Sequence, residues 1–232
     1  MIIELFGAPG SGKTFLTKQF LEHSHKNRKF LSREDFSTWL KDQDQLFKLR
    51  CIFRNLLFCT SYLVFLILLR TALQKPNIER LWMLKAILNE VMLREFLRLN
   101  SGSVILLDQG SVQRIVCFIL FSFNYRLAPV QFILKFMLPM LSRSKIQIFI
   151  NADTSISSNR VLNRTKDPSI SRFDSIDRKD SLHEKISEVT KFFISIVMML
   201  DSKNVKIRTF DNSSENKLNN SEFNKLISSI LK

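Results

Sequence analysis

The stretch that decides the fold is MIIELFGAPGSGKTFLTKQF at residues 1–20, in which GAPGSGKT occupies residues 7–14. The run IIELF at residues 2–6 is typical of a short β-strand, and the sequence from Thr14 onward is typical of a helix. The octapeptide fits the pattern GxxxxGK[ST] in the strand, loop and helix context that a phosphate-binding loop (P-loop) requires. Its glycines allow consecutive backbone N–H groups to turn toward a phosphate. The sequence therefore predicts nucleotide-phosphate binding by Gly7, Ala8, Pro9, Gly10, Ser11, Gly12, Lys13 and Thr14.

Three side chains are expected to supply the chemistry of this site. Lys13 would reach the β- and γ-phosphate oxygens of ATP, and the hydroxyl of Thr14 would ligate Mg²⁺. Asp108 directly follows SVILL (103–107), a continuous apolar run typical of a strand buried on both faces of a parallel sheet. A carboxylate at the end of such a strand is placed to complete the magnesium site. The alternative for Asp108 is a helix N-cap.

Strand-like and helix-like segments alternate along the whole chain. This alternation predicts an α/β fold with a mainly parallel sheet, covered by helices on both faces. Strands are predicted at 2–6, 29–32, 103–107, 146–150 and 205–210, and helices from 14 onward, at 36–74, 77–99, 111–142 and 182–200, and from 222 to the end of the chain. Ligands of such sheets bind beyond the carboxyl ends of the strands.

Composition limits the remaining classes of protein. A chain of 232 residues with 45% hydrophobic and 24% charged residues is expected to form one globular domain, residues 1–232, and is unlike collagen, disulfide scaffolds or disordered chains. The net charge of +14 favours anionic partners. Nucleic acid is not an expected partner, because Lys and Arg form no long run and aromatic residues are mostly Phe. Three cysteines without a CxxC spacing, and no export signal at the start, predict a cytoplasmic protein.

One segment, residues 55–69 (NLLFCTSYLVFLILL), carries no charge. As a helix it would span roughly 22 Å, which is short of the ~30 Å hydrocarbon core of a bilayer. We therefore expect a buried core helix or a helix that docks on a partner, with a membrane-seated segment as the alternative. The segment leaves peripheral membrane contact, protein contact and a homodimer open.

Taken together, these motifs resemble those of the P-loop nucleoside and nucleotide kinases, and within them the thymidylate-kinase-like group. Besides residues 7–14, Ser32-Arg33-Glu34-Asp35 stands where the family has an Arg-Glu-Pro turn, and Leu107-Asp108-Gln109 where it has Asp-Arg. RVLNR (160–164) and SRFD (171–174) stand where the family has an arginine-rich lid, and FDNS (210–213) where it has an adenine-lining loop.

The resemblance implies a role for each matching residue. Arg33, Glu34 and Gln109 would border the acceptor, and Asp211 would lie beside the adenine. Arg160, Arg164 and Arg172, in a lid over residues 153–175, would close over the transferred phosphoryl group. Guanidinium groups in a closing lid stabilise such charge while excluding water. A solvated basic loop or an interface patch is the alternative for these arginines.

Gln109 and Asp35 depart from the family pattern, because the family has an arginine and a proline there. A thymidylate acceptor is therefore not expected.

We expect a P-loop NTPase three-layer sandwich with a five-stranded parallel sheet in the order 2-3-1-4-5 and an arginine-containing lid. Residues 36–100 would form the helical acceptor side. The expected activity is an ATP- and Mg²⁺-dependent kinase that moves the γ-phosphoryl group to a small acceptor, namely a nucleotide, a nucleoside or a sugar-type metabolite. The alternatives are a partner- or membrane-coupled P-loop ATPase and a nucleotide-binding module without turnover.

Overall fold

A computed structural model describes most of the chain. The described residues are 1–23, 30–57, 59–61, 63, 64, 67, 80–108, 110, 113, 145–163, 179–201, 206–213 and 220–231. Within them, five strands form one parallel sheet in the order β2-β3-β1-β4-β5. The strands are β1 (Ile2–Phe6), β2 (Phe30–Leu31), β3 (Val104–Leu107), β4 (Lys145–Asn151) and β5 (Ile207–Asp211). The predicted sheet and its strand order are confirmed.

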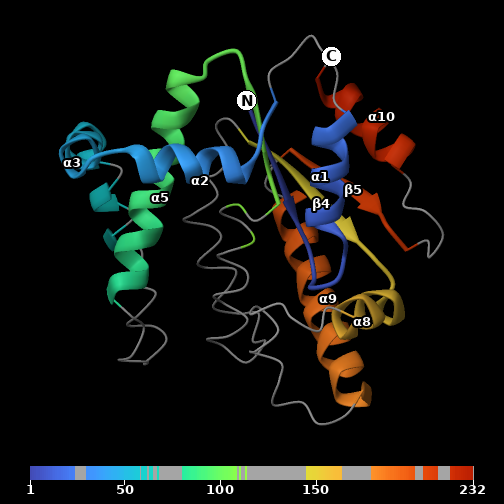
Figure 1. The fold of residues 1–232 in the computed structure, drawn as a ribbon. Coiled ribbons are helices and arrows are strands. Elements are labelled where there is room, and N and C mark those ends of the chain that lie inside the picture. The colour runs from blue at the N-terminus through green and yellow to red at the C-terminus, as the bar shows by residue number, and fades with distance from the viewer. Residues whose placement is uncertain are drawn as a thin grey trace.

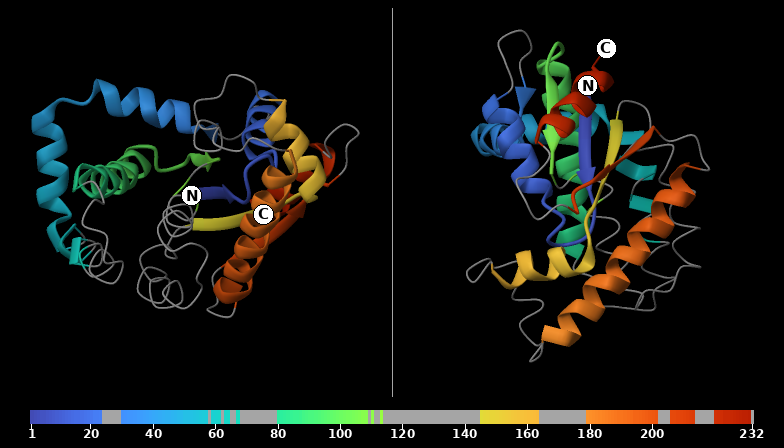
Figure 2. Two further views of the ribbon diagram at one scale, coloured as in Figure 1. Left: turned by 90° about the horizontal axis from the view of Figure 1, so that it is seen from below. Right: turned by 90° about the vertical axis from the view of Figure 1, so that its right-hand side faces the viewer.

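Helices cover both faces of the sheet, which confirms the predicted three-layer α/β sandwich (Figures 1 and 2). One face packs against α1 and α10, and the other packs against α2, α5 and α9. The described helices are α1 (Lys13–His23), α2 (Arg33–Asp42), α3 (Gln45–Arg54), α5 (Arg80–Leu99), α8 (Thr154–Leu162), α9 (Lys179–Asp201) and α10 (Asn220–Ile230).

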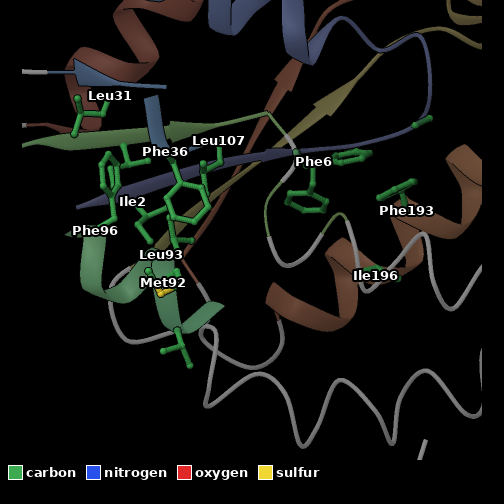
Figure 3. Close-up of a cluster of buried hydrophobic side chains, with 14 of the residues drawn as sticks. Ile2, Phe6, Leu31, Phe36, Met92, Leu93, Phe96, Leu107, Phe193 and Ile196 are labelled. Carbon is green, nitrogen blue, oxygen red and sulfur yellow. The ribbon is translucent and has the colours of Figure 1, made fainter. Parts of the chain in front are cut away.

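The alternation of side chains along β1 divides the core in two. Ile3 and Leu5 point to the cluster shared with α1 and α10, whereas Ile2 and Phe6 point to the cluster shared with the other helices. Figure 3 shows this second cluster, in which aromatic rings from α2, α5 and α9 meet the sheet. Both faces of the central strand are buried, as a parallel sheet requires. Each buried Ile, Leu or Phe contributes about 1.5–3 kcal/mol to folding.

The structure divides the long helical region predicted over 36–74 into separate helices. Ser32 caps α2 in a capping box with Asp35, so the predicted turn at 32–35 is the first turn of a helix. Helix α2 ends at Asp42, and Asp44 caps the new helix α3. The structure thus follows these caps rather than the hydrophobic period.

Asn55 ends helix α3 in a non-helical backbone conformation. Helical structure resumes directly after it, at Leu56 and Leu57. Residues 68–74 of the predicted helix lie outside the described residues, as does most of the helix predicted over 111–142. None of the described helices has the length and apolar character needed to cross a membrane.

Candidate nucleotide-binding site

The loop between β1 and α1 is held by its own lysine. Lys13 Nζ donates hydrogen bonds to the carbonyl oxygens of Gly7 (2.9 Å) and Ala8 (2.8 Å) and to Ser11 Oγ (3.1 Å). The loop lies at the carboxyl end of the central strand and leads directly into the N-terminus of α1. A positive side chain, a helix N-terminus and a glycine-rich backbone therefore meet at one place, which is the arrangement that binds phosphate.

None of the three glycines of this loop can be replaced without a clash, and Gly10 and Gly12 show this most clearly. Gly10 has φ +78°, and a Cβ there would lie 2.2 Å from the carbonyl oxygen of Ser157 in α8. Gly12 has φ +91°, and a Cβ there would lie 2.4 Å from Asn212 Nδ2. Both the backbone conformation and the close packing thus demand glycine.

Thr14 and Asp108 meet across two neighbouring strands. Thr14 Oγ1 donates a hydrogen bond of 2.7 Å to Asp108 Oδ2. Asp108 is only 8% exposed, and its other oxygen lies 3.9 Å from Arg33 Nη1. A hydroxyl and a carboxylate are oxygen ligands that suit Mg²⁺.

The described residues contain no group of three or more His, Cys, Asp or Glu that could hold a metal alone. A magnesium ion at Thr14 and Asp108 would therefore take its other ligands from phosphate and water, as Mg²⁺ commonly does.

The predicted acceptor residues begin helix α2. Arg33 and Glu34 are both exposed in its first turn, and the ion pair with Asp108 places Arg33 beside the candidate magnesium site. Gln109 lies outside the described residues. The structure thus brings one of these three side chains to the site.

Of the predicted lid arginines, Arg160 lies within the described residues, whereas Arg164 and Arg172 lie outside them. Arg160 is on α8, a helix that lies close to the loop joining β1 to α1 (Figure 1). Its guanidinium donates long hydrogen bonds, all of 3.4 Å, to the carbonyl oxygens of Gly10 and Asn212. Arg160 therefore bridges the P-loop and the segment after β5.

The start of α8 is fixed by Asp153. Its carboxylate accepts hydrogen bonds from Ser155 Oγ (2.6 Å) and the Ser155 backbone N–H (2.8 Å). These bonds lower the pKa of Asp153, because they stabilise the charged carboxylate. The helix that carries Arg160 thus begins at an anionic cap.

The segment FDNS (210–213), which spans the end of β5, makes a contact with the P-loop that the sequence did not predict. Asp211, the predicted adenine neighbour, is exposed and accepts hydrogen bonds from Ser213 Oγ (2.5 Å) and the Ser213 N–H (3.1 Å). The next residue, Asn212, is almost fully buried, and its Nδ2 donates a 2.8 Å hydrogen bond to the carbonyl oxygen of Ser11. A polar residue directly after a strand was the available signal.

A second missed feature is the carboxylate of Glu4, fully buried in the middle of β1. Glu4 accepts a hydrogen bond from the backbone N–H of Gln113 (3.2 Å), and Gln147 Nε2 lies 3.5 Å from its other oxygen. Gln113 in turn accepts a 2.9 Å hydrogen bond at Oε1 from the N–H of Gly7. These polar residues connect the core of the sheet to the first residue of the P-loop.

Comparison with known proteins gives similarity at the level of structure. No protein-family model matches the sequence, and no curated protein matches it. Among solved structures, deoxyadenosine kinase from M. mycoides with the products dCMP and dCDP is 13% identical at a TM-score of 0.48, covering 100% of this chain and 98% of that chain. The same enzyme with dCTP gives 15% identity at a TM-score of 0.47, again covering 100% and 98%.

An uncharacterised protein from Eubacterium ventriosum is also similar. It is 14% identical at a TM-score of 0.44, covering 100% of this chain and 97% of that chain. At such identities and TM-scores the likeness carries no conclusion about the activity of this chain.

Proposed function

We propose that this protein is an ATP-dependent kinase that transfers the γ-phosphoryl group to a small acceptor, namely a nucleotide, a nucleoside or a sugar-type metabolite. The observation that carries the proposal is the meeting of Lys13, Thr14 and Asp108 at one edge of the sheet. Lys13 lies against the carbonyl oxygens of the loop, and Thr14 is hydrogen-bonded to Asp108. A cation for phosphate and two oxygen ligands for Mg²⁺ are the parts that phosphoryl transfer needs.

The residues would divide the work as follows. Residues 7–14 would hold the phosphates, and the Lys13 ammonium would exchange its loop acceptors for phosphate oxygens. Thr14 and Asp108 would hold Mg²⁺, which neutralises charge on the transferred group when bound. Asp211 would lie at the adenine end.

The acceptor and the lid would close the other side of the site. Arg33, next to Asp108, would bind the acceptor together with Glu34 and Gln109. Arg160, already in contact with the backbone of Gly10, would join Arg164 and Arg172 over the phosphoryl group. Guanidinium groups are suited to this role because they form paired, charge-assisted hydrogen bonds with phosphate oxygens.

The test is ATP consumption by the purified protein with Mg²⁺, measured against a panel of nucleosides, nucleoside monophosphates and sugars. One acceptor should stimulate turnover, and Lys13→Ala should abolish the stimulation. Lys18→Ala is the matched control, because Lys18 is an exposed lysine on the same helix. Stimulation that survives in Lys13→Ala would contradict the proposal.

A partner- or membrane-coupled ATPase is the second candidate. It is favoured by the exposed apolar side chains between residues 46 and 67, because large exposed apolar patches mark interaction sites. Such an ATPase would hydrolyse ATP without any small acceptor, and added protein or lipid would change the rate. The kinase would respond to the acceptor and not to these additions.

A further inference from the structure

The helical segment 45–67 presents an apolar face to solvent on the side turned away from α5. Its inner side is anchored, since Cys51 and Cys59 are buried and Arg54 pairs with Glu95 of α5. Helix α3 lies at the outer edge of the molecule, with α5 between it and the sheet (Figures 1 and 2). The outer face carries Leu46, Leu49, Phe53, Leu56, Leu57, Leu63, Val64 and Ile67, which we call the apolar face.

The exposure of this face is large. Leu57 is 86% exposed and Phe53 is 71% exposed, and each of the eight side chains is at least 36% exposed. Their spacing follows the period of a helix both before and after the turn at Asn55. Residues 57 and 64 widen this face beyond the narrow two-position seam of a coiled coil.

Charge identifies the kind of partner. Residues 45–78 contain no Asp or Glu, whereas α3 carries Lys48, Arg50 and Arg54. Arg50 is exposed beside the apolar face. Basic residues that flank a wide apolar face are the pattern of a helix that lies in the surface of an anionic bilayer.

A second copy of the chain fits this face less well. Paired helices are usually matched by acidic and basic residues at the edges of the seam. A second copy of this helix would bring arginines and no carboxylate to pair with Arg50, because like segments carry like charges.

We propose that the apolar face docks the protein on an anionic lipid bilayer, with the helix parallel to the membrane plane. Phe53 and Leu57 would enter the boundary between headgroups and acyl chains, and Arg50 would contact lipid phosphates. The proposal is independent of the kinase activity, because the face lies outside the P-loop and its contacts.

The test is co-sedimentation of the full chain with vesicles of phosphatidylcholine alone or with about one third phosphatidylserine. Binding should require phosphatidylserine and should weaken as salt rises. The double variant Phe53→Ser/Leu57→Ser should lower the partition coefficient by about a hundredfold, since each side chain contributes about tenfold. Arg50→Gln should lower it by about fivefold.

The matched control is Met198→Ser, which removes a side chain that is 69% exposed on α9, and it should bind like the wild type. ATP binding should be the same in all variants, which separates this test from that of the proposed function and shows that the variants are folded.

Three results would overturn the proposal. One is vesicle binding that the double variant retains, which would mean that the net positive charge of the whole chain, and not the apolar face, binds the vesicles. Another is no vesicle binding together with a dimer that the double variant dissociates, which would assign the face to a second copy. The last is a monomer that does not bind vesicles, which would mean that another part of the chain or a protein partner covers the face.

Discussion

Thr14 Oγ1 donates a hydrogen bond of 2.7 Å to Asp108 Oδ2, although 94 residues separate the two along the chain. The contact follows from the sheet. Thr14 is in the helix after β1, Asp108 directly follows β3, and these two strands are parallel neighbours. The carboxyl ends of the strands therefore bring the hydroxyl and the carboxylate to the same edge.

We expect Thr14→Val to weaken the binding of Mg²⁺ in the presence of ATP. The variant loses the hydroxyl ligand, and a hydrogen bond to a charged group is worth about 1.5–3 kcal/mol. The Mg²⁺ concentration for half-saturation should rise by about tenfold or more. It can be measured by titrating Mg²⁺ at fixed ATP with a fluorescent nucleotide analogue. Thr14→Ser, which keeps the hydroxyl, should resemble the wild type, and equal effects of Val and Ser would exclude the metal role.

Gln113 should position the P-loop. It accepts the N–H of Gly7 at 2.9 Å, and its own N–H is held by buried Glu4. Gln113→Leu leaves the buried N–H of Gly7 without this acceptor, which should lower the free energy of unfolding by about 1–3 kcal/mol and weaken ATP binding.

Gln147→Leu is the comparison for that variant. It makes the same chemical change beside Glu4, but the amide of Gln147 contacts Glu4 rather than the P-loop. It should leave the dissociation constant of ATP unchanged in a calorimetric titration. Equal loss of ATP binding in both variants would assign the effect to the core and not to the loop.

The architecture was predictable because its strands are strongly patterned. SVILL is a continuous apolar segment, the run 2–6 is apolar apart from Glu4, and the motif at 7–14 specifies strand, loop and helix at once. The region after β2 was less predictable, since apolar spacing continues through Asp44 and Asn55, whereas Asp44 caps the start of α3 and Asn55 caps its end. Local capping by Ser32 and Asp44 decided the boundaries.

The residues of the candidate site were predictable where they belong to one sequence motif. They were not predictable where they come together from distant parts of the chain. Thr14 and Asp108 could be paired from the motif and the strand order. The position of Asn212 after a strand marks it as a candidate site residue, but the sequence does not identify its partner, the carbonyl oxygen of Ser11. The hydrogen bond from the N–H of Gly7 to Gln113 was not predictable either, because such contacts depend on side-chain packing between segments more than 100 residues apart.

The buried carboxylate of Glu95 on α5 should destabilise the fold strongly when its arginine partners are removed. Its side chain is 4% exposed and accepts hydrogen bonds from Arg98 (2.6 and 3.0 Å) and from Arg54 of α3. The double variant Arg54→Met/Arg98→Met leaves a buried carboxylate without these cations, which should cost about 3–5 kcal/mol.

Glu95→Met should cost less than half as much, because both arginine side chains are more than half exposed and turn to water. Urea denaturation of the two variants gives the comparison. If Glu95→Met instead lowered the free energy of unfolding more than the double variant does, the buried carboxylate would not be the group that needs its partners most.

Asp153 gives a pH dependence whose sign is defined. Its pKa in the folded protein lies below the ordinary value of 3.8, chiefly because of the hydrogen bonds from Ser155, with a smaller contribution from the charge of His183. A lowered pKa means that Asp153 stabilises the fold above the pKa of the unfolded chain, and that this contribution is lost as pH falls through the folded pKa.

At neutral pH, Asp153→Ala should therefore lower the free energy of unfolding by about 1 kcal/mol, the usual value of an N-cap. Asp153→Asn, which keeps an acceptor that does not titrate, should lose less. Urea denaturation of all three proteins from neutral pH to about pH 3 should show the difference between wild type and Asp153→Ala shrinking on acidification. A difference that stays constant or grows would mean that the carboxylate charge does not stabilise the start of α8.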